Sequence, residues 1–244
     1  MRTLVVLFAL AVPPVFAAEA HVAVAANFAA PAQRLAEAFS AASGHQLALS
    51  SGSTGKFYAQ IRSGAPFDVL LSADEETPRR LEREKLAVGG SRFTYAVGRL
   101  ALWAPKAEVR DEDVLRRGQF GRLAIANPRL APYGAAARQA LERLGLWGAV
   151  EGKIVQGENI AQTFQFVSSG NADLGFVAWS QLHERRAARA SYWLVPEALH
   201  APLRQDAALL TRASGNAAAR AFLEYLRTPP ARKRILESGY ALAP

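Results

Sequence analysis

Short, uninterrupted apolar runs alternate with amphipathic stretches along almost the whole chain. Such runs are typical of strands buried on both faces of a sheet, whereas apolar positions repeating every three or four residues are typical of helices. We predict strands over residues 21–25, 46–49, 69–72, 99–104, 123–126, 153–155, 174–177 and 207–211. We predict helices over residues 31–43, 55–63, 77–84, 134–144, 160–168, 216–226 and 230–238. This alternation predicts an α/β fold with mixed, mostly parallel sheets flanked by helices.

The first residues have the pattern of a secretory signal peptide. Arg2 gives a basic start, an apolar run follows over residues 4–12, and small residues come next. The run is shorter than the roughly 20 residues that a membrane-spanning helix needs. We therefore predict a signal peptide over residues 1–17, cleaved after Ala17 with Ala20 as the second choice. The mature chain is expected to be a soluble periplasmic protein.

Polar, glycine-containing loops follow predicted strands and precede predicted helices at four places, residues 25–28, 50–55, 127–134 and 157–160. In open α/β sheets such loops lie at the carboxyl ends of strands, where ligands bind. The first N–H groups of a helix lack helical partners and carry partial positive charge, so converging helix ends can hold an anion. Any one loop is equally explained as a cap or turn. The set of four favours an anion site.

Charge and composition exclude several classes of function. The chain has 29 basic and 21 acidic residues, but its arginine pairs are dispersed rather than gathered with aromatic residues, which disfavours nucleic-acid binding. The net charge of +8 would still raise the rate at which anions arrive. Cysteine is absent, which excludes disulfides, thiolate metal sites and cysteine nucleophiles.

The sequence offers little support for an enzyme. Residues 53–56 match S-x-x-K, the motif of serine acyl enzymes, but the companion SDN and KTG triplets are missing. Asp68 and Asp74 flank a predicted strand, where helix capping is favoured over paired acid–base chemistry. The isolated histidines are His21, His45, His183 and His200. None of them stands at the spacing of a metal site, so we predict no catalytic residues.

Stretches over the whole mature chain carry a family resemblance. They are VAVAANFAAP (22–31), SSGSTGKFYAQI (50–61), SGAPFDVLLSAD (63–74), LAIANPRLAPYGAAA (123–137), GENIAQTF (157–164), ADLGFVAWSQ (172–181) and PLRQDAALL (202–210). In this order they resemble the periplasmic molybdate-binding proteins that supply ABC importers. The segments at 63–74 and 130–137 are the most specific.

The resemblance implies a set of ligand contacts. The implied molybdate-binding residues are Ala26, Asn27, Ser53, Thr54, Tyr133 and Ile160. Ser53 and Thr54 would offer hydroxyl groups, and Ile160 a main-chain N–H group. Some relatives use a late tyrosine where this chain has Ala178, so the chain resembles the subgroup with asparagine and tyrosine in the site. The molybdenum would be bound as its oxyanion, with no protein atom on the metal.

The resemblance also implies an architecture and partners. The family fold is the two-lobed periplasmic binding protein fold (type II), with the ligand cleft between the lobes. Lobe I would hold residues 21–100 plus 203–244 and lobe II residues 101–202, with the crossings near 99–104 and 202–207 as the hinge. A monomer without a cofactor would pass its ligand to the permease of an ABC importer.

A site built only of donors predicts which anions bind. Molybdate, tungstate and sulfate are dianions at neutral pH, whereas the proton of hydrogen phosphate would stay unpaired at a cost of about 1–3 kcal/mol. Sulfate would have to be rejected by size. The alternatives are a receptor for another oxyanion or for a small organic acid and, after these, a serine acyl enzyme. An aromatic ring of Phe28 or Tyr133 stacked on the ligand would favour an organic acid.

Overall fold

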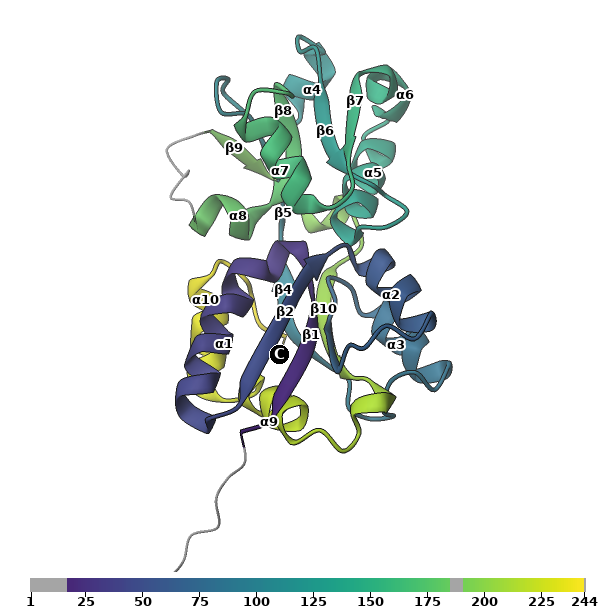
Figure 1. The fold of residues 1–244 in the computed structure, drawn as a ribbon. Helices are drawn as coiled ribbons and strands as arrows, with labels where there is room; N and C mark the ends of the chain where they lie inside the picture. Colours follow the sequence, from purple (N-terminus) through teal and green to yellow (C-terminus); the bar gives the residue numbers. More distant parts are fainter. Residues whose placement is uncertain (1–16, 185–190, 244) are drawn as a thin grey trace, which may run out of the picture.

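Two five-stranded sheets with helices on both faces form two lobes, which Figure 1 shows one above the other. The structure is a computed structural model, and it describes residues 17–184 and 191–243. The predicted α/β class and two-lobed fold are confirmed. The predicted signal peptide lies outside the described residues except for Ala17. Within the described residues, no helix is both long and apolar enough to cross a bilayer.

Lobe I is built on the sheet with the strand order β2-β1-β3-β10-β4. Its strands are β1 (Glu19–Ala25), β2 (Gln46–Gly52), β3 (Val69–Leu71), β4 (Phe93–Gly98) and β10 (Leu203–Leu209). β1 runs parallel to β2 and β3, while β10 is antiparallel to β3 and β4. Its helices are α1 (Ala29–Ser43), α2 (Thr54–Arg62), α3 (Glu76–Arg83), α9 (Ala217–Leu226) and α10 (Pro229–Glu237). Helices α1, α9 and α10 cover one face of the sheet, and α2 and α3 the other.

Lobe II repeats this plan with the order β7-β6-β8-β5-β9. Its strands are β5 (Leu100–Trp103), β6 (Leu123–Ala126), β7 (Ile154–Gly157), β8 (Leu174–Ala178) and β9 (Tyr192–Leu194). β6 runs parallel to β7 and β8, and β5 is antiparallel to β8 and β9. Its helices are α4 (Asp113–Arg117), α5 (Pro132–Arg143), α6 (Trp147–Val150), α7 (Ile160–Ser168) and α8 (Trp179–Glu184). α4, α5 and α6 pack on one face, α7 and α8 on the other.

Two connections join the lobes. β4 passes into β5 through Arg99 alone, and the chain returns over residues 195–202 between β9 and β10. Gly98 stands at the first crossing, where a Cβ atom would collide with Tyr133 Oη and lie 2.7 Å from Gln205 Nε2. This crossing therefore requires glycine, because side chains from both lobes meet there.

The structure differs from the predicted elements mainly at polar strand positions. β10 covers Leu203–Leu209 instead of 207–211 and includes Gln205 and Asp206, whose side chains are fully buried. Asp206 accepts hydrogen bonds from Arg92 Nη1 at 2.5 Å and Thr94 Oγ1 at 2.7 Å, so its burial is compensated. Strands β4 and β9, together with the short helices α4, α6 and α8, were not predicted.

Candidate functional site: a small closed pocket between the lobes

The carboxyl ends of β1, β2, β6 and β7 meet at a small pocket between the lobes. The pocket is lined by Ala25, Ala26, Asn27, Gly52, Ser53, Thr54, Ala73, Ala131, Pro132, Tyr133, Asn159 and Ile160. All six residues that the sequence predicted for the site therefore line one pocket between the lobes. The cavity volume is only about 10 Å³. Pockets for organic ligands usually measure about 300–1,000 Å³, so this one is far too small for an organic ligand.

Two hydroxyl groups enter the pocket from the start of α2. Thr54 is 2% exposed, and its Oγ1 accepts the N–H of Ala73 at 3.0 Å. That bond uses a lone pair of the oxygen and not the hydroxyl proton of Thr54, which can be donated to a ligand. Ser53 is 3% exposed, and its Oγ has no hydrogen-bond partner. A buried hydroxyl without a partner costs about 1–3 kcal/mol, which an incoming acceptor would recover.

Asn27 reaches the pocket from the 3-10 turn η1 (Ala26–Phe28), which follows β1 directly. Its Nδ2 donates to Gln205 Oε1 at 2.8 Å and to Tyr240 Oη at 3.0 Å, so both amide protons are engaged behind the pocket. Neither proton of the side-chain amide is therefore left for a ligand. In the structure the donors that this turn can offer are main-chain N–H groups, since its first N–H groups have no partner within the turn.

Tyr133 supplies a main-chain donor at the start of α5. Pro132 has no N–H group, and the N–H groups of Gly134 and Ala135 both bond to Ala131 O, at 2.9 and 3.0 Å. The N–H group of Tyr133 is left without a helical partner. The hydroxyl of Tyr133 points elsewhere, because it accepts from Gln205 Nε2 at 3.2 Å. Burial raises the pKa of this hydroxyl well above its ordinary value, so the phenol stays neutral.

Ile160 supplies a second main-chain donor from lobe II, at the start of α7. The capping residue Asn159 accepts the N–H groups of Ala161 and Gln162 through its Oδ1, both at 3.0 Å. The cap therefore satisfies the second and third N–H groups and leaves that of Ile160, which lines the pocket. As at Tyr133, the donor belongs to the main chain.

None of the described residues that line the pocket has a charged side chain. The nearby carboxylate of Asp74 accepts from Ser72 Oγ at 3.1 Å, Thr77 N at 2.8 Å and Thr77 Oγ1 at 3.1 Å, which is a capping role at α3 as predicted. Burial raises the pKa of the Asp74 carboxyl, although these hydrogen bonds oppose the shift. Among the described residues, no group of three or more histidine or acidic side chains could hold a metal ion. The site therefore consists of neutral donors.

The lobes touch around this pocket. Gly55 N donates to Leu130 O across the interface at 2.8 Å, and a Cβ atom on Gly55 would lie only 3.0 Å from that carbonyl oxygen. Lys56 of α2 forms an ion pair with Glu158 of the loop before α7. Arg34 of α1 pairs with Glu184 of α8 at 2.5 Å. The structure is therefore a closed form, in which helix ends from both lobes surround the pocket.

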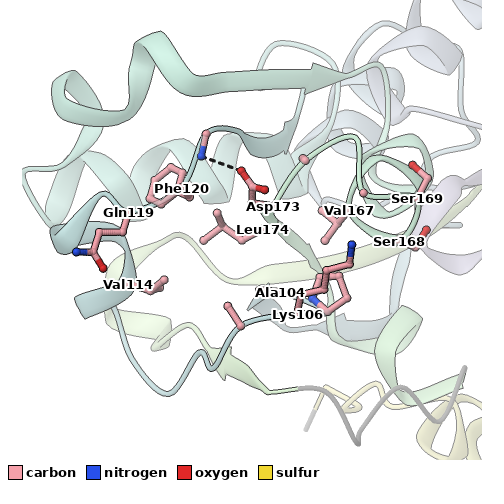
Figure 2. A pocket seen from close by; sticks show the side chains of 15 residues that line it. Ala104, Lys106, Val114, Gln119, Phe120, Val167, Ser168, Ser169, Asp173 and Leu174 are labelled. Carbon is pink, nitrogen blue, oxygen red and sulfur yellow. Dashed lines mark hydrogen bonds between the residues drawn. The ribbon is translucent and has the colours of Figure 1, made fainter.

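A much larger cavity lies elsewhere, and Figure 2 shows it. It measures about 480 Å³ and sits in lobe II beside the amino ends of β6 and β8, at the opposite end of these strands from the predicted loops. Its lining includes the apolar Val167 and Leu174, and its acidic residue Asp173 accepts the N–H group of Gly121 at 2.8 Å. None of the described residues that line it has a buried polar side-chain atom without a partner, so size alone does not make it the functional site.

Two residues behind the pocket were missed from the sequence. Gln205 of β10 and Tyr240 of the C-terminal tail are buried, and both bond to Asn27. Gln205 could have been recognised from the sequence, because it and Asp206 form a polar pair within an apolar segment. No sequence pattern connects Tyr240 with the site before the fold is known. Ala178, which stands where some relatives have a tyrosine, is fully buried in β8 and does not line the pocket.

A two-lobed α/β protein that closes on a small pocket of neutral donors has the architecture of a solute receptor. The family model "Bacterial extracellular solute-binding protein" matches residues 20–241, and the chain belongs to this family. It is 51% identical to the molybdate-binding protein ModA of Azotobacter vinelandii, over 93% of this chain and 91% of the relative. It is 44% identical to the ModA protein of Rhodobacter capsulatus, over 93% and 90%. The resemblance to molybdate-binding proteins is confirmed.

A solved structure agrees with these relatives. The periplasmic molybdate-binding protein of Azotobacter vinelandii superposes with a TM-score of 0.87 at 38% identity, covering 92% of this chain and all of the other. A match over 92% of the chain includes parts of both lobes.

Proposed function

We propose that this protein is a periplasmic receptor that captures molybdate between its lobes and delivers it to an ABC importer. The observation that carries the proposal is the convergence of buried, neutral donors from four strand-to-helix loops on one pocket. The ligand is cargo rather than a cofactor, and no chemical step is assigned to the protein. The names of the relatives support molybdate as the anion.

The proposed ligand contacts are the hydroxyl groups of Ser53 and Thr54 and the main-chain N–H groups at Ala26, Asn27, Tyr133 and Ile160. Each group can donate a hydrogen bond, and no carboxylate is found among the described residues of the pocket lining to accept one. Such a site binds dianions without a proton, and hydrogen bonds to a charged acceptor are stronger than neutral ones. Tungstate has the same charge and shape, so we expect it to bind as well.

The pocket argues against the organic-acid alternative. Phe28 is fully buried against Tyr95 and Tyr240, with ring centroids 4.8 and 5.2 Å away, so its ring does not face the pocket. The hydroxyl of Tyr133 faces Gln205. Neither ring is placed as a platform for an organic ligand, and the S-x-x-K serine lacks a partner that could activate it.

The sheets support the proposed lobe bounds, residues 21–100 plus 203–244 and residues 101–202. β1–β4 and β10 share one sheet, and β5–β9 share the other. Removal of a signal peptide after Ala17 agrees with the hydrogen bond from Gln46 N to Ala18 O at 2.9 Å. Cleavage after Ala20 would remove residues that pair with β2. We propose that the mature receptor works as a monomer.

Titration calorimetry on residues 18–244 tests the function. We expect tight binding of molybdate and tungstate, and weak binding of sulfate and hydrogen phosphate. Asp173→Asn, which changes the large cavity of lobe II, serves as the matched control and should bind molybdate as the unchanged chain does. Binding heat from a small organic acid, with none from molybdate, would refute the proposal. It would also be refuted if the unchanged chain bound molybdate and Asp173→Asn did not.

A further inference from the structure

A buried hydrogen-bond network lies directly behind the anion pocket and crosses from lobe I to lobe II. Its centre is Tyr240, which follows α10 and is 4% exposed. The tail that carries it pairs with β4 next to the interlobe crossing, where Val97 N donates to Ala241 O at 2.7 Å and Ala241 N to Val97 O at 2.9 Å. The segment around Tyr240 and Ala241 is therefore held against the hinge.

The hydroxyl group of Tyr240 uses its full hydrogen-bonding capacity. It donates to the main-chain carbonyl of Asn27 at 2.7 Å and accepts Asn27 Nδ2 at 3.0 Å. It also accepts the hydroxyl of Ser180 at 2.9 Å. One proton and two lone pairs are all that a phenol offers, so each group is matched. Burial raises the pKa of Tyr240 above its ordinary value, which keeps that proton in place.

These contacts join three parts of the molecule. Asn27 belongs to the turn that opens the pocket in lobe I, Ser180 belongs to α8 of lobe II, and Tyr240 comes from the C-terminal tail. The bond from Ser180 connects lobe II to the lobe I tail in the closed form, and separation of the lobes at this point would break it. The bonds to Asn27 hold the turn through its carbonyl and its side chain at once.

We propose that Tyr240 is a positioning residue for ligand capture, which fixes the Asn27 turn in its binding geometry and favours the closed lobes through Ser180. The inference rests on the proposed anion-binding function, because its first test measures the rates of molybdate binding and release. It predicts that removing one hydroxyl outside the pocket lining shortens the lifetime of the complex, because reopening becomes easier.

Tyr95 offers a matched control. It is buried like Tyr240, and both rings pack edge-to-face on Phe28. Its hydroxyl faces Ser72 O at 3.1 Å and Gln205 Oε1 at 3.2 Å, both within lobe I. Tyr95→Phe and Tyr240→Phe therefore remove the same atom from similar surroundings, but only the second breaks a bond between the lobes.

The first readout is stopped-flow kinetics with molybdate. Tyr240→Phe should raise the dissociation rate about 10- to 100-fold and leave the association rate within about 3-fold. Tyr95→Phe should leave both rates within about 3-fold, and Ser180→Ala should reproduce part of the Tyr240→Phe effect. Equal rates for Tyr240→Phe and the unchanged chain would overturn the proposal, and so would equal losses in Tyr240→Phe and Tyr95→Phe.

The second readout needs no ligand. The chain has no cysteine, so Ser63→Cys and Ser169→Cys, two exposed positions on different lobes, allow a fluorescent pair to report the interlobe distance. Tyr240→Phe should shift the ligand-free population toward the longer distance, whereas Tyr95→Phe should not. If the unchanged chain does not bind molybdate, the proposed function is wrong, but the distance measurement still tests the role of Tyr240. If Tyr240→Phe leaves the distribution of interlobe distances unaltered, the proposed role of Tyr240 is wrong.

Discussion

The two lobes share one strand order but supply the pocket with different kinds of donor. In lobe I the loops after β1 and β2 bring the turn at Asn27 and the side-chain hydroxyls of Ser53 and Thr54. In lobe II the loops after β6 and β7, which occupy the corresponding places, bring the main-chain N–H groups of Tyr133 and Ile160. The same topology thus places helix N-termini on both sides of the pocket.

The difference determines how each half of the site can be damaged. A hydroxyl donor is lost when its side chain is truncated. A main-chain donor survives almost any substitution at its own position and is lost only when the backbone that carries it moves. Side-chain changes should therefore act through lobe I, and backbone changes through lobe II.

The largest effect is expected at Gly134 in the first turn of α5. A Cβ atom there would collide with Ala126 O, a main-chain atom at the end of β6 that cannot yield easily. Gly134→Ala should displace the N–H group of Tyr133 and weaken molybdate binding about 100-fold, since a shift near 1 Å costs that much in a preorganised site. Calorimetry measures the loss. Gly148→Ala, where a Cβ atom meets nothing within 4 Å, is the control, and equal affinities for the two variants would contradict the account.

An intermediate effect is expected at Thr54. Thr54→Ala removes the proposed donor and leaves the N–H group of Ala73 without its acceptor. We expect the binding free energy to fall by about 2 kcal/mol, because a charged acceptor loses a buried hydrogen bond. Thr54→Ser keeps the hydroxyl group and should retain most of the affinity in the same calorimetric assay. An alanine variant that binds as tightly as the serine variant would exclude Thr54 from the site.

The smallest effect is expected at Ile160. Ile160→Val changes the side chain but keeps the N–H group and the Asn159 cap, so molybdate affinity should change by less than about 0.5 kcal/mol. The unfolding free energy should fall by about 0.5–1.5 kcal/mol, because one buried methylene group is removed. Calorimetry and denaturant unfolding separate the two quantities. If the binding free energy for molybdate fell by more than the unfolding free energy, lobe II would also hold the ligand through its side chains.

Much of the fold was predictable, because its strands are apolar on both faces. β6 and α7 begin and end at the predicted residues, and Asn159 and Gly44 mark helix ends as caps do. The missed strand β4 has no such pattern, since several of its residues are only half-buried. The start of β10 was missed because Asp206 looks like a loop residue until its partner Arg92 is known.

The pocket residues were predictable as loop residues, but their roles were not. Which protons of Asn27 are free depends on Gln205 and Tyr240, which lie 178 and 213 positions away in sequence. Local patterns show that a donor is present, whereas only the tertiary structure shows where it points. For the same reason Tyr240 could not be connected with the site from its own neighbours.

The most direct test of the account is a crystal structure of the mature chain grown with molybdate. We predict one anion between the lobes, within hydrogen-bond distance of Ser53, Thr54 and the N–H groups of Tyr133 and Ile160, and with no charged side chain in contact. An anion held by a lysine or arginine side chain, or bound in the large cavity of lobe II with the interlobe pocket empty, would contradict it.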